Sequence, residues 1–386
     1  MSRRVSAGAC LLLAAGLLVG DSTAPPAPAK KLLEAIRGVG KEGKGNAEAA
    51  KAWKGLVAMG PAALEPILDA LNDDELVAGN WLQPAFEAIA EKAAEDGTLS
   101  TALLGKAVAD KKKSNGARSL AYAWLVKRDE TAAARLLPNM LSDPAPDLRR
   151  LAVDYVVERA DALRARDEKD KTAKDLYRKA FLAAGDPEQV ESIAKILTKL
   201  GEKPDVAKQL GVVSRWHFVT PFDHGKGKGF DVAYAPEKGV DLTATYKGKA
   251  DKNAAWVEHR TTDPQGVVDL AKVLGPLKGT IAYVYATVEV PETRKAYLRV
   301  SSINALKVFV NGKESFALEE YHHGTRIDQY AVRVPLVKGK NEILLKVCQN
   351  EQKEPWAQKW MFQLRICDTV GCAVPFTQTG AKKEDK

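Results

Sequence analysis

Two adjacent histidines late in the chain are the residues best suited to chemistry. His322 and His323 follow Tyr321 and precede Arg326. Imidazole can bind a metal or transfer a proton near neutral pH, so a metal site or a catalytic dyad is one interpretation. Adjacent side chains on an extended strand point to opposite faces, however, and do not easily share one metal. A surface loop is the simpler interpretation, and a ligand-contacting loop would make all four residues binding candidates.

Trp356 is the aromatic residue with the clearest potential for binding. It follows a polar segment, residues 349–355, whose composition predicts a loop. An exposed indole can stack on the apolar face of a sugar or anchor a protein contact. The alternative is a side chain folded back over the neighbouring strands, because exposed tryptophan is uncommon.

Four acidic residues occur close together in a stretch rich in turns: Asp223, Asp231, Glu237 and Asp241. Carboxylate oxygens in loops are the ligands that calcium prefers, so the four residues form a candidate calcium site. The spacing is not that of an EF-hand, and ordinary surface acids remain the alternative.

Catalytic motifs are absent from the sequence. Residues 225–229, Gly-Lys-Gly-Lys-Gly, lack the spacing of a phosphate-binding loop, and no Ser or Thr follows either lysine, so a flexible loop explains them better. The chain contains neither G-x-S-x-G nor H-E-x-x-H. Nothing in the sequence pairs two carboxylates across a cleft, as glycoside hydrolysis requires. We therefore expect no enzymatic activity.

The cysteine positions permit one disulfide in an oxidising compartment and disfavour a zinc site. Cys367 and Cys372 flank a predicted turn, so a disulfide between them is plausible, with Cys348 left as a buried thiol. The chain has four cysteines, and removal of Cys10 with the N-terminal segment described next would leave three, an odd number that leaves this pairing open. Zinc is disfavoured because no C-x-x-C pair is present.

The N-terminus has the pattern of a secretory signal peptide over residues 1–29. Arg3 and Arg4 precede an apolar run, residues 5–19, and residues 27–29 read Ala-Pro-Ala, a small-residue cleavage motif. The run is short for a membrane span, although an uncleaved anchor is the alternative. A secreted or periplasmic protein follows, with no stable membrane span after cleavage.

The charge of the chain gives no indication of a nucleic-acid partner. The formal net charge is +8, from 58 basic and 50 acidic residues. Binding to nucleic acid would need a clustered basic stripe. The short lysine runs at residues 111–113 and 382–383 have acids close by and are interpreted as solvated surface.

Residues 30–204 have the pattern of a helical repeat domain. Leu64, Ile67, Leu68 and Leu71 recur at helical spacing and predict one buried stripe. Helix starts marked by proline recur at intervals of 83 and 43 residues, the range of HEAT and armadillo repeats. Residues 60–64 and 143–152 resemble the helix starts of HEAT repeats, which implies an α-helical solenoid of roughly four repeats.

After a predicted linker, residues 205–213, the pattern changes to short strands. Strands are expected at 281–290, 296–300, 306–310, 313–316, 330–336, 342–348 and 360–366. Asn311-Gly312 predicts a tight type I′ hairpin turn. Short strands without intervening helices favour an antiparallel β-sandwich or jelly roll over residues 214–375. Residues 376–386 form a predicted charged, disordered tail.

The strand region carries a family resemblance. Residues 308–313, 336–347 and 360–366 resemble the galactose-binding-like β-sandwich, a module appended to secreted glycosidases and other extracellular proteins. The opening residues, 216–223 and 229–237, are similar to the start of such modules in secreted bacterial multidomain proteins. The resemblance implies a fold, often with one structural calcium, and no catalytic residues.

These patterns predict a multidomain α + β protein with a non-enzymatic binding or scaffold role. The solenoid is expected to contact a protein partner, and the β-sandwich to bind a glycan or a second protein. No cofactor is expected apart from calcium. Two alternatives stay open: a purely structural assembly unit, and an accessory module of carbohydrate hydrolysis.

Overall fold

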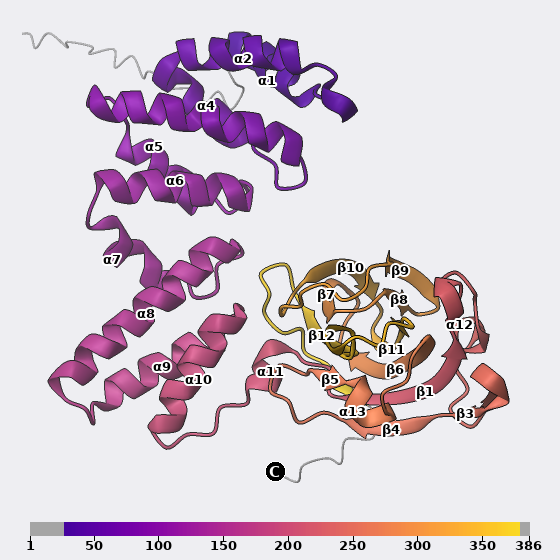
Figure 1. Cartoon of the computed structure of the whole chain (residues 1–386). Helices are drawn as coiled ribbons and strands as arrows, with labels where there is room; N and C mark the ends of the chain where they lie inside the picture. Colours follow the sequence, from indigo (N-terminus) through magenta and orange to yellow (C-terminus); the bar gives the residue numbers. More distant parts are fainter. Residues whose placement is uncertain (1–26, 379–386) are drawn as a thin grey trace, which may run out of the picture. The chain divides into compact units, whose positions relative to one another are not determined.

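The computed structural model describes residues 27–378, in which helices come first and antiparallel sheets second (Figure 1). This confirms the expectation of a mixed α and β protein. The chain divides into two compact units, one up to Arg128 and one from Asp129 onward. Arg3, Arg4 and the apolar run of the predicted signal peptide lie outside the described residues, as does the predicted tail beyond residue 378.

The described part of the first unit, residues 27–128, contains helices and no strands. Within α3 (Leu64–Ala70), Leu64, Ile67 and Leu68 are all buried, as the predicted stripe requires. Residues 27–29, the predicted cleavage motif, form the first turn of α1. The unit consists of α1 (Ala27–Arg37), α2 (Asn46–Ala58), α3 (Leu64–Ala70), α4 (Leu76–Glu95), α5 (Thr101–Ala109) and α6 (Asn115–Arg128).

The second unit begins with five further helices: α7 (Ala132–Leu136), α8 (Pro146–Arg166), α9 (Lys171–Ala183), α10 (Pro187–Lys199) and α11 (Val206–Leu210). Asp186 caps α10, since its Oδ1 accepts hydrogen bonds from the backbone N–H groups of Glu188 and Gln189 at 3.0 and 3.1 Å. The segment expected to be a linker forms α11, and its Leu210 packs into the apolar core of α8, α9 and α10.

The strands form two larger sheets and one hairpin. The first sheet has the order β4-β1-β6-β11-β8-β9, with β13 also paired to β6, and the second has the order β10-β7-β12-β5. The strand pairs are antiparallel throughout both sheets. The strands are β1 (Arg215–Asp223), β2 (Thr245–Lys247), β3 (Asn253–Ala255), β4 (Val257–Arg260), β5 (Val268–Asp269), β6 (Thr280–Val290), β7 (Arg294–Ser302), β8 (Leu306–Val310), β9 (Lys313–Leu318), β10 (Tyr330–Leu336), β11 (Gly339–Gln349), β12 (Met361–Cys367) and β13 (Thr377–Gln378).

Both larger sheets contribute to one apolar core. Val284 and Leu345 come from the first sheet, and Leu298 and Leu364 from the second. The opposite face of the first sheet is covered by the segment between β1 and β4, which includes α12 (Ala235–Lys238) and packs Phe230 against it. The first sheet is therefore buried on both faces, which explains its near-continuous apolar strands.

The predicted hairpin between β8 and β9 is confirmed. Asn311 and Gly312 have φ values of 50° and 77°. A type I′ turn needs positive φ at both central residues, and asparagine and glycine tolerate it best. Residues 377–378, which fall in the predicted tail, are ordered as β13, and the Gln378 side chain accepts a hydrogen bond from the backbone N–H of Ser214.

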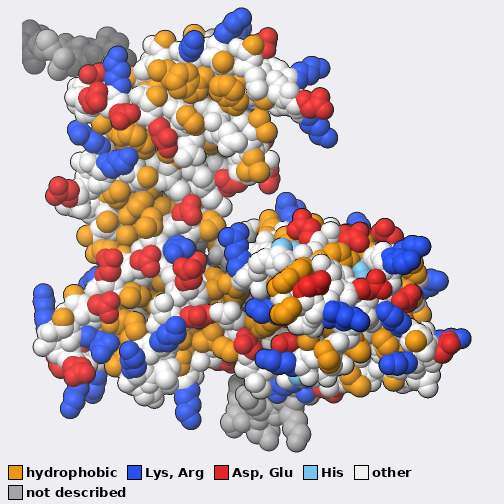
Figure 2. Space-filling view, in the orientation of Figure 1, with side chains coloured by type: hydrophobic (Ala, Val, Ile, Leu, Met, Phe, Trp, Pro, Cys, Tyr) orange, Lys and Arg blue, Asp and Glu red, His pale blue; other side chains and the backbone are white. Residues whose placement is uncertain are grey.

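The described surface of the β region, Arg215–Gln378, is chemically mixed. Figure 2 shows basic and acidic side chains intermingled on its visible face, without a continuous stripe of one sign. Among residues 27–378, no helix combines the length and the apolar character needed to cross a membrane.

Candidate functional site

An exposed tryptophan, a histidine and a tyrosine meet where two loops of the β region come together. His322 and Tyr321 lie in the loop between β9 and β10, and Trp356 lies in a short 3-10 turn between β11 and β12. The rings of His322 and Trp356 pack edge to face, with centroids 5.2 Å apart. Trp356 is 59% exposed. We call Tyr321, His322 and Trp356 the aromatic cluster.

His322 is held firmly in this position. Its backbone N–H donates to the carbonyl of Ile303 at 2.7 Å, and its Nε2 lies 2.8 Å from Oδ1 of Asn350. The residue has a φ of 56°, a left-handed conformation that is unfavourable for most residues other than glycine and that these hydrogen bonds help to hold. These contacts hold the imidazole in one position beside the indole of Trp356.

A buried histidine supports the tyrosine of the cluster. The Tyr321 hydroxyl lies 2.6 Å from Nε2 of His224, whose side chain is fully buried. Burial lowers the pKa of His224, and the nearby Lys346 cation lowers it further, while Asp223 opposes the shift. His224 is therefore neutral at neutral pH and acts as a positioning residue for Tyr321.

The glycine-rich segment after β1 lies beside the cluster, as a loop. The backbone N–H of Lys226 donates to Oε2 of Glu351 at 3.2 Å, and those of Gly227 and Lys228 donate to backbone carbonyls. These donors are already used, so the segment does not offer the array of free N–H groups that cradles a phosphate.

The structure separates the other two predicted binding residues from the cluster. The His323 ring faces Gln329, whose Nε2 lies 3.0 Å from His323 Nδ1, so the two adjacent histidines do point apart. Arg326 lines a different pocket. Three of the five predicted ligand-binding residues therefore meet at one place.

The four predicted calcium ligands are not brought together. Asp223 and Asp231 are 62% and 86% exposed and face lysines at 3.7 and 3.4 Å. Asp241 accepts from the Thr243 hydroxyl. Glu237 faces the fully buried Lys346 at 2.9 Å. The described part of the chain contains no group of three or more His, Cys, Asp or Glu placed to hold a metal ion.

The three described cysteines are free thiols, so the predicted disulfide between Cys367 and Cys372 is not formed in this structure. Cys367 points toward the carbonyl of Leu210, whereas Cys372 accepts from Arg149 Nη1 at 2.7 Å. Burial raises the pKa of Cys348 and of Cys367 to about 12. These two thiols are inert rather than nucleophilic at neutral pH.

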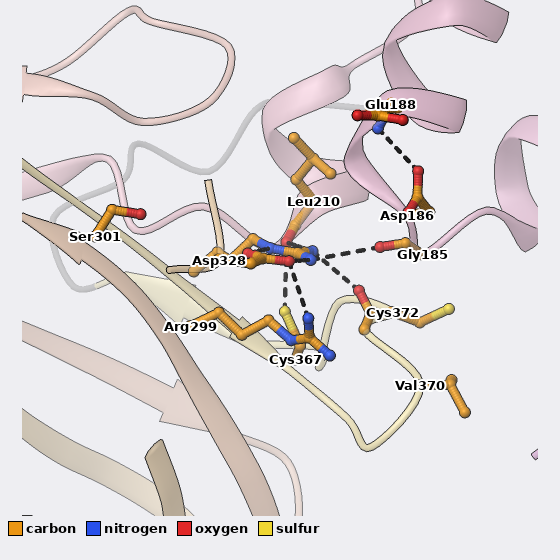
Figure 3. Close-up of polar contacts among 12 residues, drawn as sticks. Gly185, Asp186, Glu188, Leu210, Arg299, Ser301, Asp328, Cys367, Val370 and Cys372 are labelled. Carbon is orange, nitrogen blue, oxygen red and sulfur yellow. Dashed lines mark hydrogen bonds and ion pairs between the residues drawn. The ribbon is translucent and has the colours of Figure 1, made fainter. Parts of the chain in front are cut away.

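A buried arginine, which the sequence did not reveal, joins the β region to the helices before it. Arg365 on β12 is fully buried and forms a two-pronged ion pair with Asp328. Its remaining N–H groups donate to the carbonyls of Leu210, Gly371 and Gly185 at 3.2, 2.9 and 3.4 Å. Figure 3 shows Asp328, Leu210 and Gly185 converging on this contact.

A pocket of about 180 Å³ lies next to this ion pair, where α8 and α10 begin. Two of the three carboxylates that line it are ion-paired: Asp186 with Arg150 at 2.9 Å, and Asp328 with Arg299 at 3.0 Å. A glycosidase needs two available carboxylates that face each other. This pocket therefore does not have the chemistry of a hydrolase site.

Comparisons with known proteins add little to this picture. No family model matches the sequence, and no curated protein matches it. Among solved structures, a β-glucosidase from Kluyveromyces marxianus aligns with 52% of this chain and 29% of its own, at 8% identity and a TM-score of 0.25. A GH31 α-xylosidase from Xanthomonas citri aligns with 29% of this chain and 14% of its own, at 11% identity and a TM-score of 0.16. The chain spans less than a third of either enzyme, and TM-scores this low support no conclusion about fold or activity.

Proposed function

We propose that this chain is a non-enzymatic binding protein, exported from the cytoplasm, whose β region binds a glycan at the aromatic cluster. The helical part would contact a protein partner. Export rests on the signal-peptide pattern of residues 1–29.

The arrangement of elements supports the two fold assignments within this proposal. The two larger sheets share one core, as the layers of a galactose-binding-like β-sandwich or jelly roll do. Within each unit, helices consecutive in the chain pack on one another, α1 on α2, α5 on α6 and α8 on α9. Such pairs are the building blocks of a HEAT-like solenoid, whose surface serves for protein contact.

The exposed indole of Trp356 is the observation that carries glycan binding. A tryptophan with 59% of its surface exposed has no role in the core, and its ring offers a flat apolar face. Polar groups lie near it: the His322 ring packs against it at a centroid distance of 5.2 Å, and the side chains of Asn350 and Gln352 are joined by a 2.7 Å hydrogen bond. An apolar face flanked by amides and an imidazole matches the mixed surface of a sugar ring.

The helical part offers an apolar surface for a protein. Leu76 and Val77, at the start of α4, are 75% and 49% exposed. Exposed apolar side chains next to each other are suited to a protein contact. The alternative partner is a second copy of this chain. Light scattering distinguishes the two: the mass of a single chain would exclude self-association and favour a different protein as the partner.

The test is a glycan array probed with the full-length secreted protein and three variants. Trp356→Ala should weaken binding about tenfold or more, because it removes the whole aromatic surface. Trp356→Phe should keep much of the binding, since it retains an aromatic face. Leu242→Ala removes an exposed aliphatic side chain elsewhere in the β region and should have no effect. An array on which the parent protein binds no glycan, or binds equally well as Trp356→Ala, would refute the proposal.

A further inference from the structure

A second pocket lies on the outer face of the smaller sheet, under the loop that connects β9 to β10. Its volume is about 120 Å³. The floor comes from paired positions on β7 and β12, Ser301 opposite Gln363. The loop closes one side with residues 325–327. The lining residues are Gln265, Val267, Ser301, Thr325, Arg326, Ile327, Met361, Phe362 and Gln363.

One buried amide in this pocket has an unsatisfied atom. Gln363 is 3% exposed, and its Nε2 has no hydrogen-bond partner among the described residues. Its Oε1 lies 3.0 Å from the Ser301 hydroxyl, which also lies 2.6 Å from the carbonyl of Arg326. A buried polar atom without a hydrogen-bond partner is destabilising, so its presence in the lining of a pocket indicates that a ligand atom supplies the partner.

The remaining lining defines the chemistry of that missing partner. No carboxylate lines the pocket, and its one charged residue, Arg326, is exposed at the loop. Val267, Ile327 and Met361 supply apolar walls. The occupant should therefore be small and uncharged, with a hydrogen-bonding group for Gln363 and an apolar group for these walls.

An acetamido group meets each of these requirements. Its carbonyl oxygen accepts from an amide N–H, its own N–H donates to an amide oxygen, and its methyl group fits the apolar walls. It therefore pairs with Gln363 whichever of the two amide atoms faces the pocket. We propose that this pocket binds the acetamido group of an N-acetylated sugar, an inference that rests on the glycan-binding function proposed above and names the class of sugar.

The placement of the loop agrees with this assignment. Tyr321 and His322 of the aromatic cluster and residues 325–327 of the pocket belong to the same connection between β9 and β10. His322 fixes the loop near its start, and Asp328 fixes it near its end through the pair with Arg365. The pocket wall is therefore preorganised rather than formed on binding.

The experiment is isothermal titration calorimetry of the full-length protein with three probes: N-acetylglucosamine, glucose and acetate. We expect saturable one-to-one binding of N-acetylglucosamine and none of glucose, which lacks the acetamido group. Acetate has the methyl group and a charge, so binding of acetate in preference to N-acetylglucosamine would make the pocket an anion site of Arg326 and overturn the proposal.

Two variants place the binding. Gln363→Met removes the amide at nearly constant volume, and Thr325→Phe fills the pocket from an exposed position where folding is not at risk. Each should weaken N-acetylglucosamine binding at least tenfold, whereas Leu242→Ala, at an exposed position outside both the pocket and the aromatic cluster, should leave it unchanged. Binding that survives Thr325→Phe, or no titration with any probe, overturns the pocket assignment.

These outcomes are separable from failure of the proposed function. If N-acetylglucosamine binds as described but the glycan array does not respond to Trp356→Ala, the aromatic cluster is the part that fails. If the array responds to Trp356→Ala but no monosaccharide titrates, the pocket is the part that fails.

Discussion

Asp328 accepts two hydrogen bonds from the guanidinium of Arg365, which is fully buried. Asp328 also accepts from Arg299 at 3.0 Å. The carboxylate belongs to the loop between β9 and β10, and both arginines belong to strands of the smaller sheet. One acid therefore neutralises a buried charge and fixes the loop that carries Tyr321, His322 and one wall of the proposed acetamido pocket.

Asp328→Asn should destabilise the protein strongly. Losing one partner of a buried ion pair leaves an uncompensated charge, which costs about 3–5 kcal/mol. Urea unfolding followed by tryptophan fluorescence measures this loss. Glu292→Gln is the matched control, because the Glu292 side chain is 68% exposed and its pair with Arg294 should contribute about 1 kcal/mol or less. Equal unfolding midpoints for the two variants would contradict the role of Asp328.

The buried ion pair between Lys346 and Glu237 should also stabilise the protein, and removing both charges should restore part of the stability that is lost when Lys346 alone is replaced. Lys346 is fully buried and donates to Glu237 and to the carbonyls of Phe230 and Val232. Lys346→Met should cost about 3–5 kcal/mol in the free energy of unfolding. The double variant Lys346→Met/Glu237→Gln should regain part of that loss, because the unpaired carboxylate is gone. A double variant less stable than Lys346→Met alone would show that the charge of Glu237 is balanced elsewhere.

Stability should fall as the pH drops below neutrality because of His224. Burial lowers its folded-state pKa below the ordinary value of 6.5. The unfolded chain therefore takes up a proton first, and the free energy of unfolding decreases as the pH falls from about 7 through 6.5 toward the lowered pKa. Urea unfolding at pH 7.5 and 5.5 measures the decrease. It should be smaller in His224→Gln, and an identical pH dependence in that variant would assign the effect to other groups.

The thiols should react with iodoacetamide in a fixed order at pH 8. Burial raises the pKa of Cys348 and Cys367 to about 12, so both should resist labelling in the folded protein. Cys372 is less buried, and although burial raises its pKa too, Arg149 opposes the shift, so it should react first. Peptide mass spectrometry identifies the labelled sites. If Cys367 and Cys372 stay unlabelled in denaturant until a reductant is added, they form the disulfide that their spacing suggested.

Local chemistry made part of this structure predictable. Asn311-Gly312 specifies its turn with two residues, and the strands beside it follow from alternating apolar side chains. The polar residues before Trp356 predicted that it lies outside a strand, as it does, but left open whether its side chain is exposed or folded back. Each of these predictions depends on neighbours in sequence, and such neighbours stay together whatever the rest of the chain does.

The ion pairs were not predictable, because their partners are distant in sequence. Arg365 and Asp328 are 37 residues apart, and Lys346 and Glu237 are 109 apart. The calcium site was expected because acids cluster between residues 223 and 241, and sequence does not show which cation faces each acid. In the structure, Lys346 forms an ion pair with Glu237, and Lys307 forms one with Asp231.

The close packing of Cys372 against Gly185 determines where the chain can be cut without disrupting the β region. A side chain there would collide with Cys372, whose backbone N and Sγ would both lie 2.9 Å from an added Cβ. Beside it, Arg365 uses carbonyls on both sides of residue 211, those of Gly185 and Leu210 before it and that of Gly371 after it. A β region excised at residue 211 would keep the buried cation but lose two of its acceptors. The smaller sheet and the segments at Gly185 and Leu210 therefore fold as one unit, and a chain break within residues 205–213 would separate the Arg365 cation from two of the carbonyls that accept its hydrogen bonds.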